Sequence, residues 1–478
     1  MKIGQRQEIW QNMLFAGLAL EICYALEKSG ECVIMATKKQ GIWGWMFFDW
    51  ASQPFHTLII TFIFAPYFAS QVAESPERGQ EIWGYAAAAA SFTVAILAPI
   101  LGAIADQSGP RKPWVAMFSV LYAIGASSLW YMTPVDPEPW LLLVGFAIGL
   151  IGVEFATVFT NSLLPELGTK EEVGRISGSG WAMGYWGGVL SLVVALALFV
   201  PAPGGEATLI GMAPIFGAGE GEGARATGPL TAVWYLVFMI PFFMWTPDTK
   251  KQKLDKGAVA AGLGQFGDTL KALPSNSSLF AYLMSSMFYR DALNGVYIFG
   301  GIFAAGVLGW GTFQLGIFGI VAAVAGAIGA WVGGRVDQSI GPKPVINFCI
   351  VTLMLVCAVM VSTGPSEILF LPLEEGSGLP TIAFYICGAV IGAAGGSLQS
   401  ASRTMLIRQA EPGKMTEAFG IYALAGKATS FIAPFMIAVM TGAFESQRIG
   451  ITPVIGLFLI GLILMFWVSR NGQTDAKA

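Results

Sequence analysis

The sequence is poor in charged residues, and this scarcity excludes several classes of protein. Charged residues make up 12% of its 478 residues and the mean hydropathy is +0.65, whereas about 25% charged residues is usual for a soluble domain. So few polar groups cannot cover the surface of a soluble protein. The formal net charge of -4 also provides no basic surface for a phosphate backbone. We therefore exclude a soluble enzyme and a nucleic-acid binder.

Histidine and cysteine are scarce as well. His56 is the single histidine, so no histidine-rich zinc site can form, and the five cysteines contain no Cys-x-x-Cys pair. The chain also lacks the Gly-x-x-x-x-Gly-Lys-Ser/Thr sequence of a P-loop ATPase. We expect no metal, no cofactor and no catalytic residues, and hence no enzyme.

Long apolar runs dominate the chain, and a membrane-spanning helix needs about 20 mostly apolar residues. The sequence predicts twelve such spans, at 43–69, 82–105, 113–132, 140–164, 176–200, 228–246, 279–305, 312–334, 344–363, 380–402, 417–441 and 450–469. If residues before the first span are cytoplasmic, the external loops carry only Arg78, Arg225 and Arg448, and the remaining loop lysines and arginines are internal. The positive-inside rule then places both termini in the cytoplasm. We expect a bacterial plasma (inner) membrane, with a eukaryotic vacuole as the alternative.

The N-terminal 34 residues are harder to interpret. Their short apolar run, 13–20, is interrupted by Glu21 and is too short for a signal peptide. A cytoplasmic extension and a translation start at Met35 remain alternatives.

An internal repeat divides the chain. The sequence Asp-Gln-Ser, followed by Gly-Pro and a basic residue, occurs at 106–111 and again at 337–343, six spans later. We therefore predict an all-α membrane protein of two parallel six-helix repeats. The expected divisions are an N-terminal extension (1–42), a first half (43–246), a cytoplasmic linker (247–278), a second half (279–469) and a tail (470–478). The glycine-rich stretch 178–188 lies inside an apolar span, which favours close helix packing over a nucleotide-binding loop.

Five charged residues lie well inside predicted spans, where charge is costly and usually functional. They are Asp49, Glu154, Arg290, Asp291 and Lys427, and polar residues at helical spacing extend them into stripes that include Gln53, His56, Thr157, Asn161, Asn294 and Tyr297. Three acids face two bases, so pairing leaves one carboxylate that can take up a proton. We expect Glu154 or Asp49 to carry the proton, and Arg290 and Lys427 to act as counter-ions or to bind a substrate carboxylate. Static pairs that hold the bundle together are the alternative interpretation.

The repeated loop resembles a motif of the major facilitator superfamily. Gly102, Asp106, Gly109, Arg111 and Lys112 match its Gly-x-x-x-Asp-x-x-Gly-x-Arg-Lys pattern, whereas Gln107 departs from it. The resemblance implies that these residues, with Arg335, Asp337 and Gly341 of the second copy, form cytoplasmic gating loops. A generic charged turn is the alternative.

Longer segments resemble one branch of that superfamily, the vacuole-effluxer-like permeases, which include autophagy-related amino-acid effluxers. The resemblance rests on 48–68, on Phe-Tyr-Arg-Asp at 288–291 and on 419–429, and it spans about 43–469. It implies solute transport of the amino-acid export type. Together with the buried charges, it leads us to expect a monomeric, proton-coupled secondary transporter of a small polar solute that works by alternating access in the lipid bilayer. A non-transporting receptor or scaffold is the alternative.

Overall fold

The computed structural model describes residues 37–73, 76–133, 139–169, 172–200, 207–216, 221–249, 264, 267–268, 271–308, 310, 312–374, 377–411, 413–444 and 446–470. Most of the predicted extension (1–42), most of the linker (247–278) and nearly all of the tail (470–478) lie outside these ranges. What is described is a bundle of long helices with one short β-hairpin.

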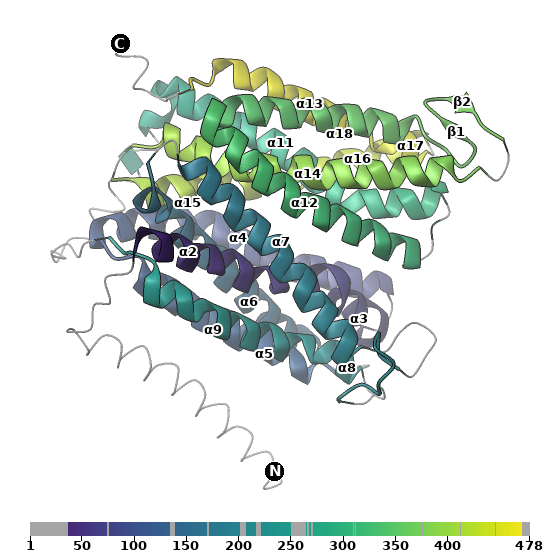
Figure 1. The fold of residues 1–478 in the computed structure, drawn as a ribbon, viewed down its shortest axis with the longest axis horizontal. Helices are drawn as coiled ribbons and strands as arrows, with labels where there is room; N and C mark the ends of the chain where they lie inside the picture. The colour runs from purple at the N-terminus through teal and green to yellow at the C-terminus, as the bar shows by residue number, and fades with distance from the viewer. Residues whose placement is uncertain are drawn as a thin grey trace, which may run out of the picture.

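The helices up to residue 245 form a first group, drawn from purple to teal in Figure 1. Its elements are α2 (Lys38–Pro54), η1 (Phe55–Phe62), α3 (Phe64–Tyr67), η2 (Phe68–Val72), α4 (Pro76–Ser108), α5 (Lys112–Ser128), η3 (Leu129–Tyr131), α6 (Pro139–Ser162), η4 (Leu164–Leu167), α7 (Val173–Leu198), α8 (Glu222–Arg225) and α9 (Thr227–Trp245).

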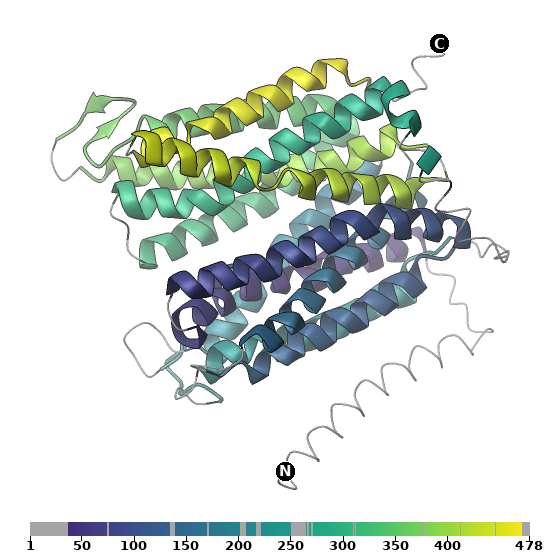
Figure 2. The same cartoon turned by 180° about the vertical axis from the view of Figure 1, so that it is seen from behind.

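The remaining helices form a second group, drawn from green to yellow, which lies beside the first in both views (Figures 1 and 2). Its elements are η5 (Leu273–Ser275), α11 (Ser277–Leu308), α12 (Thr312–Ile340), α13 (Pro342–Val361), β1 (Glu367–Ile368), β2 (Leu371–Pro372), α14 (Leu379–Gln409), α15 (Met415–Ala428), α16 (Ile432–Phe444), α17 (Gln447–Gly450), α18 (Thr452–Leu464) and η6 (Met465–Trp467).

The expected all-α membrane architecture is confirmed. Ten helical segments of the described residues are long and apolar enough to cross a membrane. The segment α2–η1 and the charged helix α11 complete the set of twelve. The protein is therefore a multi-pass membrane protein with the twelve-helix fold.

The first span begins earlier than predicted and is not one regular helix. Thr37 and Gln40 form a capping box, which starts α2 at Lys38 rather than at residue 43. The α-helix ends at Pro54 and continues as a π-helix over Phe55–Phe62. Proline removes one donor of the α-helical ladder, which accounts for the change of helix type at this point.

The predicted span 417–441 is also interrupted. It consists of α15 and α16, and the three residues between Ala428 and Ile432 separate the two helices. Broken helices inside a membrane occur where other protein groups satisfy the freed backbone. This break lies beside charged residues of α11, as described below.

The two groups meet along two seams, α4 against α15 and α7 against α12. Glycines allow the backbones to approach closely there. A Cβ on Gly178 of α7 would lie 2.3 Å from the carbonyl oxygen of Ala330, and one on Gly420 of α15 would lie 2.6 Å from that of Ala98. The glycine-rich stretch 178–188 is thus a packing surface, as predicted from its apolar context.

The bundle has two distinguishable ends. The antiparallel hairpin β1–β2 projects from one of them, which we call the hairpin end. The loops after α4 and α12, which carry the repeated Asp-Gln-Ser sequence, lie at the opposite end, which we call the motif end.

Candidate transport pathway

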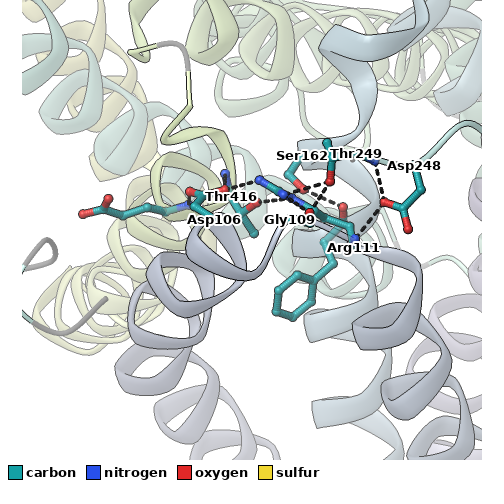
Figure 3. A network of polar contacts seen from close by, with 9 residues as sticks. Asp106, Gly109, Arg111, Ser162, Asp248, Thr249 and Thr416 are labelled. Carbon is teal, nitrogen blue, oxygen red and sulfur yellow. Dashed lines mark hydrogen bonds and ion pairs between the residues drawn. The ribbon is translucent and has the colours of Figure 1, made fainter. Parts of the chain in front are cut away.

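The first repeated loop links the two helix groups at the motif end. Asp106, at the end of α4, forms a buried ion pair with Arg111 and accepts hydrogen bonds from the backbone N–H groups of Thr416 (3.2 Å) and Glu417 (2.9 Å). Arg111 in turn donates from Nε to Oγ1 of Thr416 at 3.1 Å. Figure 3 shows this network from close by. The carboxylate thus caps the N-terminus of α15, where a negative charge is stabilised by the helix dipole.

The same loop also forms hydrogen bonds within the first helix group. Gly109 adopts φ +91°, a value that favours glycine, and its carbonyl oxygen accepts from Arg111 and Thr249. Asp248, just after α9, accepts from the backbone N–H groups of Arg111 at 2.7 Å and Lys112 at 3.1 Å. The loop is therefore a rigid part of the first group, and its contacts with α15 are those that would break if the groups separated here.

The second copy of the loop is arranged differently. Asp337 of α12 is fully buried against the first turn of α7, where a Cβ on Gly174 would lie 2.6 Å from its Cγ. Gly341 has φ +86°, matching Gly109. Arg335, however, lies over the ring of Trp331 at 3.3 Å, on the surface of α12. The repeat places both aspartates at a seam. Asp106 forms an ion pair with Arg111, whereas Asp337 interacts with Thr404 and lies within electrostatic range of Arg408, both on α14.

A deeper contact joins Asp49 of α2 to Arg403 of α14, with Oδ2 and Nη1 3.3 Å apart. Both side chains are largely buried, and the guanidinium also lies within 5.4 Å of the rings of Trp45 and Trp181. The predicted span 380–402 ends one residue before Arg403, which would put this arginine in a loop. In the structure α14 continues to Gln409, which brings Arg403 into the bundle.

The centre of the bundle holds a second ion pair between the groups. Nζ of Lys427 on α15 lies 2.8 Å from Oε1 of Glu154 on α6. Their side chains remain 28% and 21% exposed, so open space adjoins the pair. His56, at the start of the π-helix, lies within electrostatic range of both charges. Three predicted pathway residues, from three different helices, therefore meet here.

Arg290 of α11 lies close to this pair without belonging to it. Its guanidinium stacks on Tyr422 at 4.0 Å, donates to the Tyr422 carbonyl oxygen at 3.0 Å, and acts electrostatically on Glu154. Within the described residues no carboxylate pairs with Arg290. A half-buried guanidinium without a carboxylate partner suits an anionic group of a solute.

Asp291, the next residue of α11, points elsewhere. It is 3% exposed and accepts a hydrogen bond at 2.8 Å from the backbone N–H of Ala433, in the first turn of α16. It therefore satisfies the backbone where the broken helix resumes. Once Arg403 is counted, three acids face three bases. Arg403 pairs with Asp49 and Lys427 with Glu154, so the carboxylate left without a basic partner among the described residues is Asp291, which serves as a helix cap.

The remaining predicted pathway residues line the same helices. Gln53 packs against Gly188 of α7, where a Cβ would lie 2.9 Å from its Cγ. Asn161 and Asn294 are half-buried on α6 and α11. Tyr297 is 43% exposed, and its hydroxyl faces Gly395 of α14. No cluster of three metal-binding side chains occurs in the part of the chain that the structure describes.

Comparison with known protein families shows to which family the chain belongs. A model of the "Vacuole effluxer Atg22 like" family matches residues 80–477. The chain belongs to this family. It is 25% identical over 439 residues to an uncharacterized MFS-type transporter, YxiO, of Bacillus subtilis (strain 168), which covers 91% of this chain and 96% of that protein. Autophagy-related protein 22 of Coccidioides immitis (strain RS) is 23% identical over 267 residues, 52% of this chain and 43% of that protein.

Solved structures share the fold. The human organic anion transporter MFSD10 aligns with a TM-score of 0.66 at 15% identity, covering 90% of this chain and 99% of that chain. The proton:xylose symporter XylE aligns with a TM-score of 0.63 at 14% identity, covering 93% and 99%. The predicted superfamily and its vacuole-effluxer-like branch are thus confirmed, and the protein is a membrane transporter rather than an enzyme.

Proposed function

We propose that the protein is a proton-coupled exporter of a small zwitterionic solute of the amino-acid type. It works as a monomer in a plasma (inner) membrane, with the motif end and both termini in the cytoplasm. The observation that carries this proposal is the central group of charges: the Glu154–Lys427 pair, which spans the two helix groups, and Arg290 beside it.

The contacts between the groups suit alternating access. The Asp106–Thr416 and Asp49–Arg403 contacts hold the motif end together in this structure. Each consists of hydrogen bonds or an ion pair rather than a large interlocked apolar surface, so it can break and re-form. The motif end is the cytoplasmic end in this proposal because nearly all loop lysines and arginines lie there.

The chemistry of the centre favours a zwitterion. Arg290 offers its guanidinium to a carboxylate, and Glu154 can accept an ammonium group in place of Lys427. Splitting the 2.8 Å pair leaves neither charge unpaired if the ammonium group of the solute contacts Glu154 and its carboxylate contacts Lys427 as well as Arg290. A neutral sugar could not compensate the two separated charges.

The same arrangement couples transport to protons. A proton and the ammonium group of the solute compete for the carboxylate of Glu154, so only one of them occupies it at a time. Such competition produces antiport, in which protons entering the cell drive the solute out. Export thus follows from the shared site and an inward proton gradient.

The experiment is proton flux in proteoliposomes with an internal pH-sensitive dye, using pools of amino acids. We expect solute-dependent flux with the wild type, solute exchange without proton flux with Glu154→Gln, and loss of both with Arg290→Gln. Glu166→Gln, an exposed glutamate at the motif end, is the matched control and should keep full flux. Retained proton flux in Glu154→Gln would refute its role as carrier. A folded wild type that moves no protons with any pool would refute the amino-acid substrate.

A further inference from the structure

A basic groove at the motif end lies outside the pathway. It has a volume of about 450 Å³ and is lined by α2, α7 and α12, with Lys38, Lys39, Ile42, Trp43, Met46, Glu172, Arg175, Ile176, Ser179 and Arg335 at its walls. Four of these residues are cations and one is an anion. Because α12 belongs to the second helix group and α2 and α7 to the first, the groove straddles the seam between the groups.

The one acid of the groove, Glu172, already forms ion pairs within the groove. Oε2 of Glu172 accepts from Nζ of Lys38 at 2.6 Å, and its Oε1 lies 4.0 Å from Arg175. The bond from Lys38 lowers the pKa of Glu172, so this side chain stays ionised at neutral pH. Within the described residues neither Lys39 nor Arg335 forms an ion pair. The groove therefore retains a surplus of positive charge.

The seam brings two of the cations together. Arg175, in the first turn of α7, and Arg335, near the end of α12, act on each other electrostatically. Directly beneath them, Gly178 and Gly334 hold the two backbones in contact. Closing the motif end thus forces two guanidinium groups from opposite helix groups into one groove. An anion placed between them would remove this repulsion.

Apolar surface adjoins the groove. Trp43, in its wall, is 44% exposed, and Trp331, which lies beside the groove under the stacked Arg335, is 47% exposed. Exposed apolar residues continue along α12 at Val332 and Val336. Tryptophan is enriched at the level of the lipid headgroups, and basic pockets between membrane helices hold anionic headgroups.

From the charge surplus, the like-charged arginines and the aromatic walls we propose that this groove binds an anionic phospholipid of the adjacent leaflet. The phosphate lies among Lys39, Arg175 and Arg335, and the acyl chains run along the tryptophans and the apolar face of α12. Because both helix groups supply cations, the bound lipid stabilises the form in which the motif end is closed. This assignment does not depend on the identity of the transported solute.

The test measures lipid binding to the purified full-length protein by native mass spectrometry and thermal unfolding. Phosphatidylglycerol is compared with phosphatidylcholine of the same acyl chains. We expect selective retention of phosphatidylglycerol and a higher unfolding temperature in its presence. Lys39→Gln and Arg335→Gln should each weaken retention about fivefold, as expected for one lysine or arginine near an anionic surface.

The control is Lys271→Gln, which removes an exposed lysine from the chain just before η5, outside the groove. It should retain the lipid like the wild type. Lys39 is itself exposed, so its substitution keeps the test valid even if Arg335→Gln unfolds. Equal binding of the two lipids, or an equal loss in the Lys271 variant, would overturn the proposal. So would inorganic phosphate that raises the unfolding temperature as much as the lipid, because the ligand would then be a soluble anion.

Discussion

Replacing Asp106 by asparagine should open the motif end. In the closed form the carboxylate accepts two backbone N–H groups of α15, from Thr416 and Glu417. Hydrogen bonds to a charged acceptor contribute about 1.5–3 kcal/mol each. Asparagine keeps one neutral acceptor oxygen, worth about 0.5–1.5 kcal/mol, and its NH₂ group faces the other donor.

The net loss for the closed form is therefore about 2.5–4.5 kcal/mol. Since 1.4 kcal/mol is a factor of ten, the ratio of closed to open molecules should fall about 60- to 1,600-fold. The lost pairing with Arg111 affects both forms alike, because the two residues belong to the same loop of the first group. It should lower the overall stability without changing this ratio.

The assay is the distance between spin labels at Thr169 and Ser339, two exposed positions at the motif end on opposite sides of the α7–α12 seam. The labels are placed in a background without the five native cysteines. Asp106→Asn should shift the distances to longer values. Asp248→Asn is the matched control, because Asp248 also accepts two backbone N–H groups, but within the first group. An equal shift in both variants, or none in Asp106→Asn, would refute the reasoning.

Two further substitutions test the seams and the broken helix. Gly178→Ala would place a Cβ 2.3 Å from the Ala330 carbonyl oxygen, so it should open the motif end in the same spin-label assay. The control is Gly300→Ala, which should leave the distances unchanged because a Cβ there meets nothing within 4 Å. Asp291→Ala should lower thermal stability in detergent by about 1–3 kcal/mol, because the N–H of Ala433 loses its buried acceptor. Asp291→Asn, which retains an acceptor, should be milder and keep proton flux; loss of flux in a stable Asp291→Asn protein would indicate a direct role in proton transfer.

The twelve-helix fold could be predicted from the sequence because membrane spans depend on local composition. Twenty apolar residues and the distribution of lysine and arginine need no knowledge of tertiary contacts. The irregularities were harder to predict. Pro54 accounts for the π-helix after α2, and Pro434, the third residue of α16, follows the break after Ala428. The group that satisfies the backbone there could not be found locally, because Asp291, the acceptor for the N–H of Ala433, lies far away in the chain.

The charged residues of the pathway were found because charge is rare inside a membrane, but their partners were not. Counting charges within predicted spans omitted Arg403, which stands one residue beyond a predicted boundary and pairs with Asp49. An uncertainty of a few residues in a helix end is harmless for the fold. Here it decides the charge balance. With Arg403 included, acids and bases are equal in number, and Asp291 and Arg290 are the two that form no ion pair among the described residues.

Each copy of the repeated loop places its aspartate at a seam between the two helix groups, but the contacts of the two aspartates differ in strength. Asp106 meets an arginine and two backbone donors, so it forms strong and specific contacts across the α4–α15 seam. Asp337 meets the Cα surface of Gly174, while the arginine of its own loop, Arg335, turns outward over Trp331. The α7–α12 seam therefore closes by glycine packing, with the cations of the groove beside it. If an anionic lipid binds among these cations as proposed, the strength of the α7–α12 seam depends on the lipid, whereas the hydrogen bonds of Asp106 at the α4–α15 seam do not.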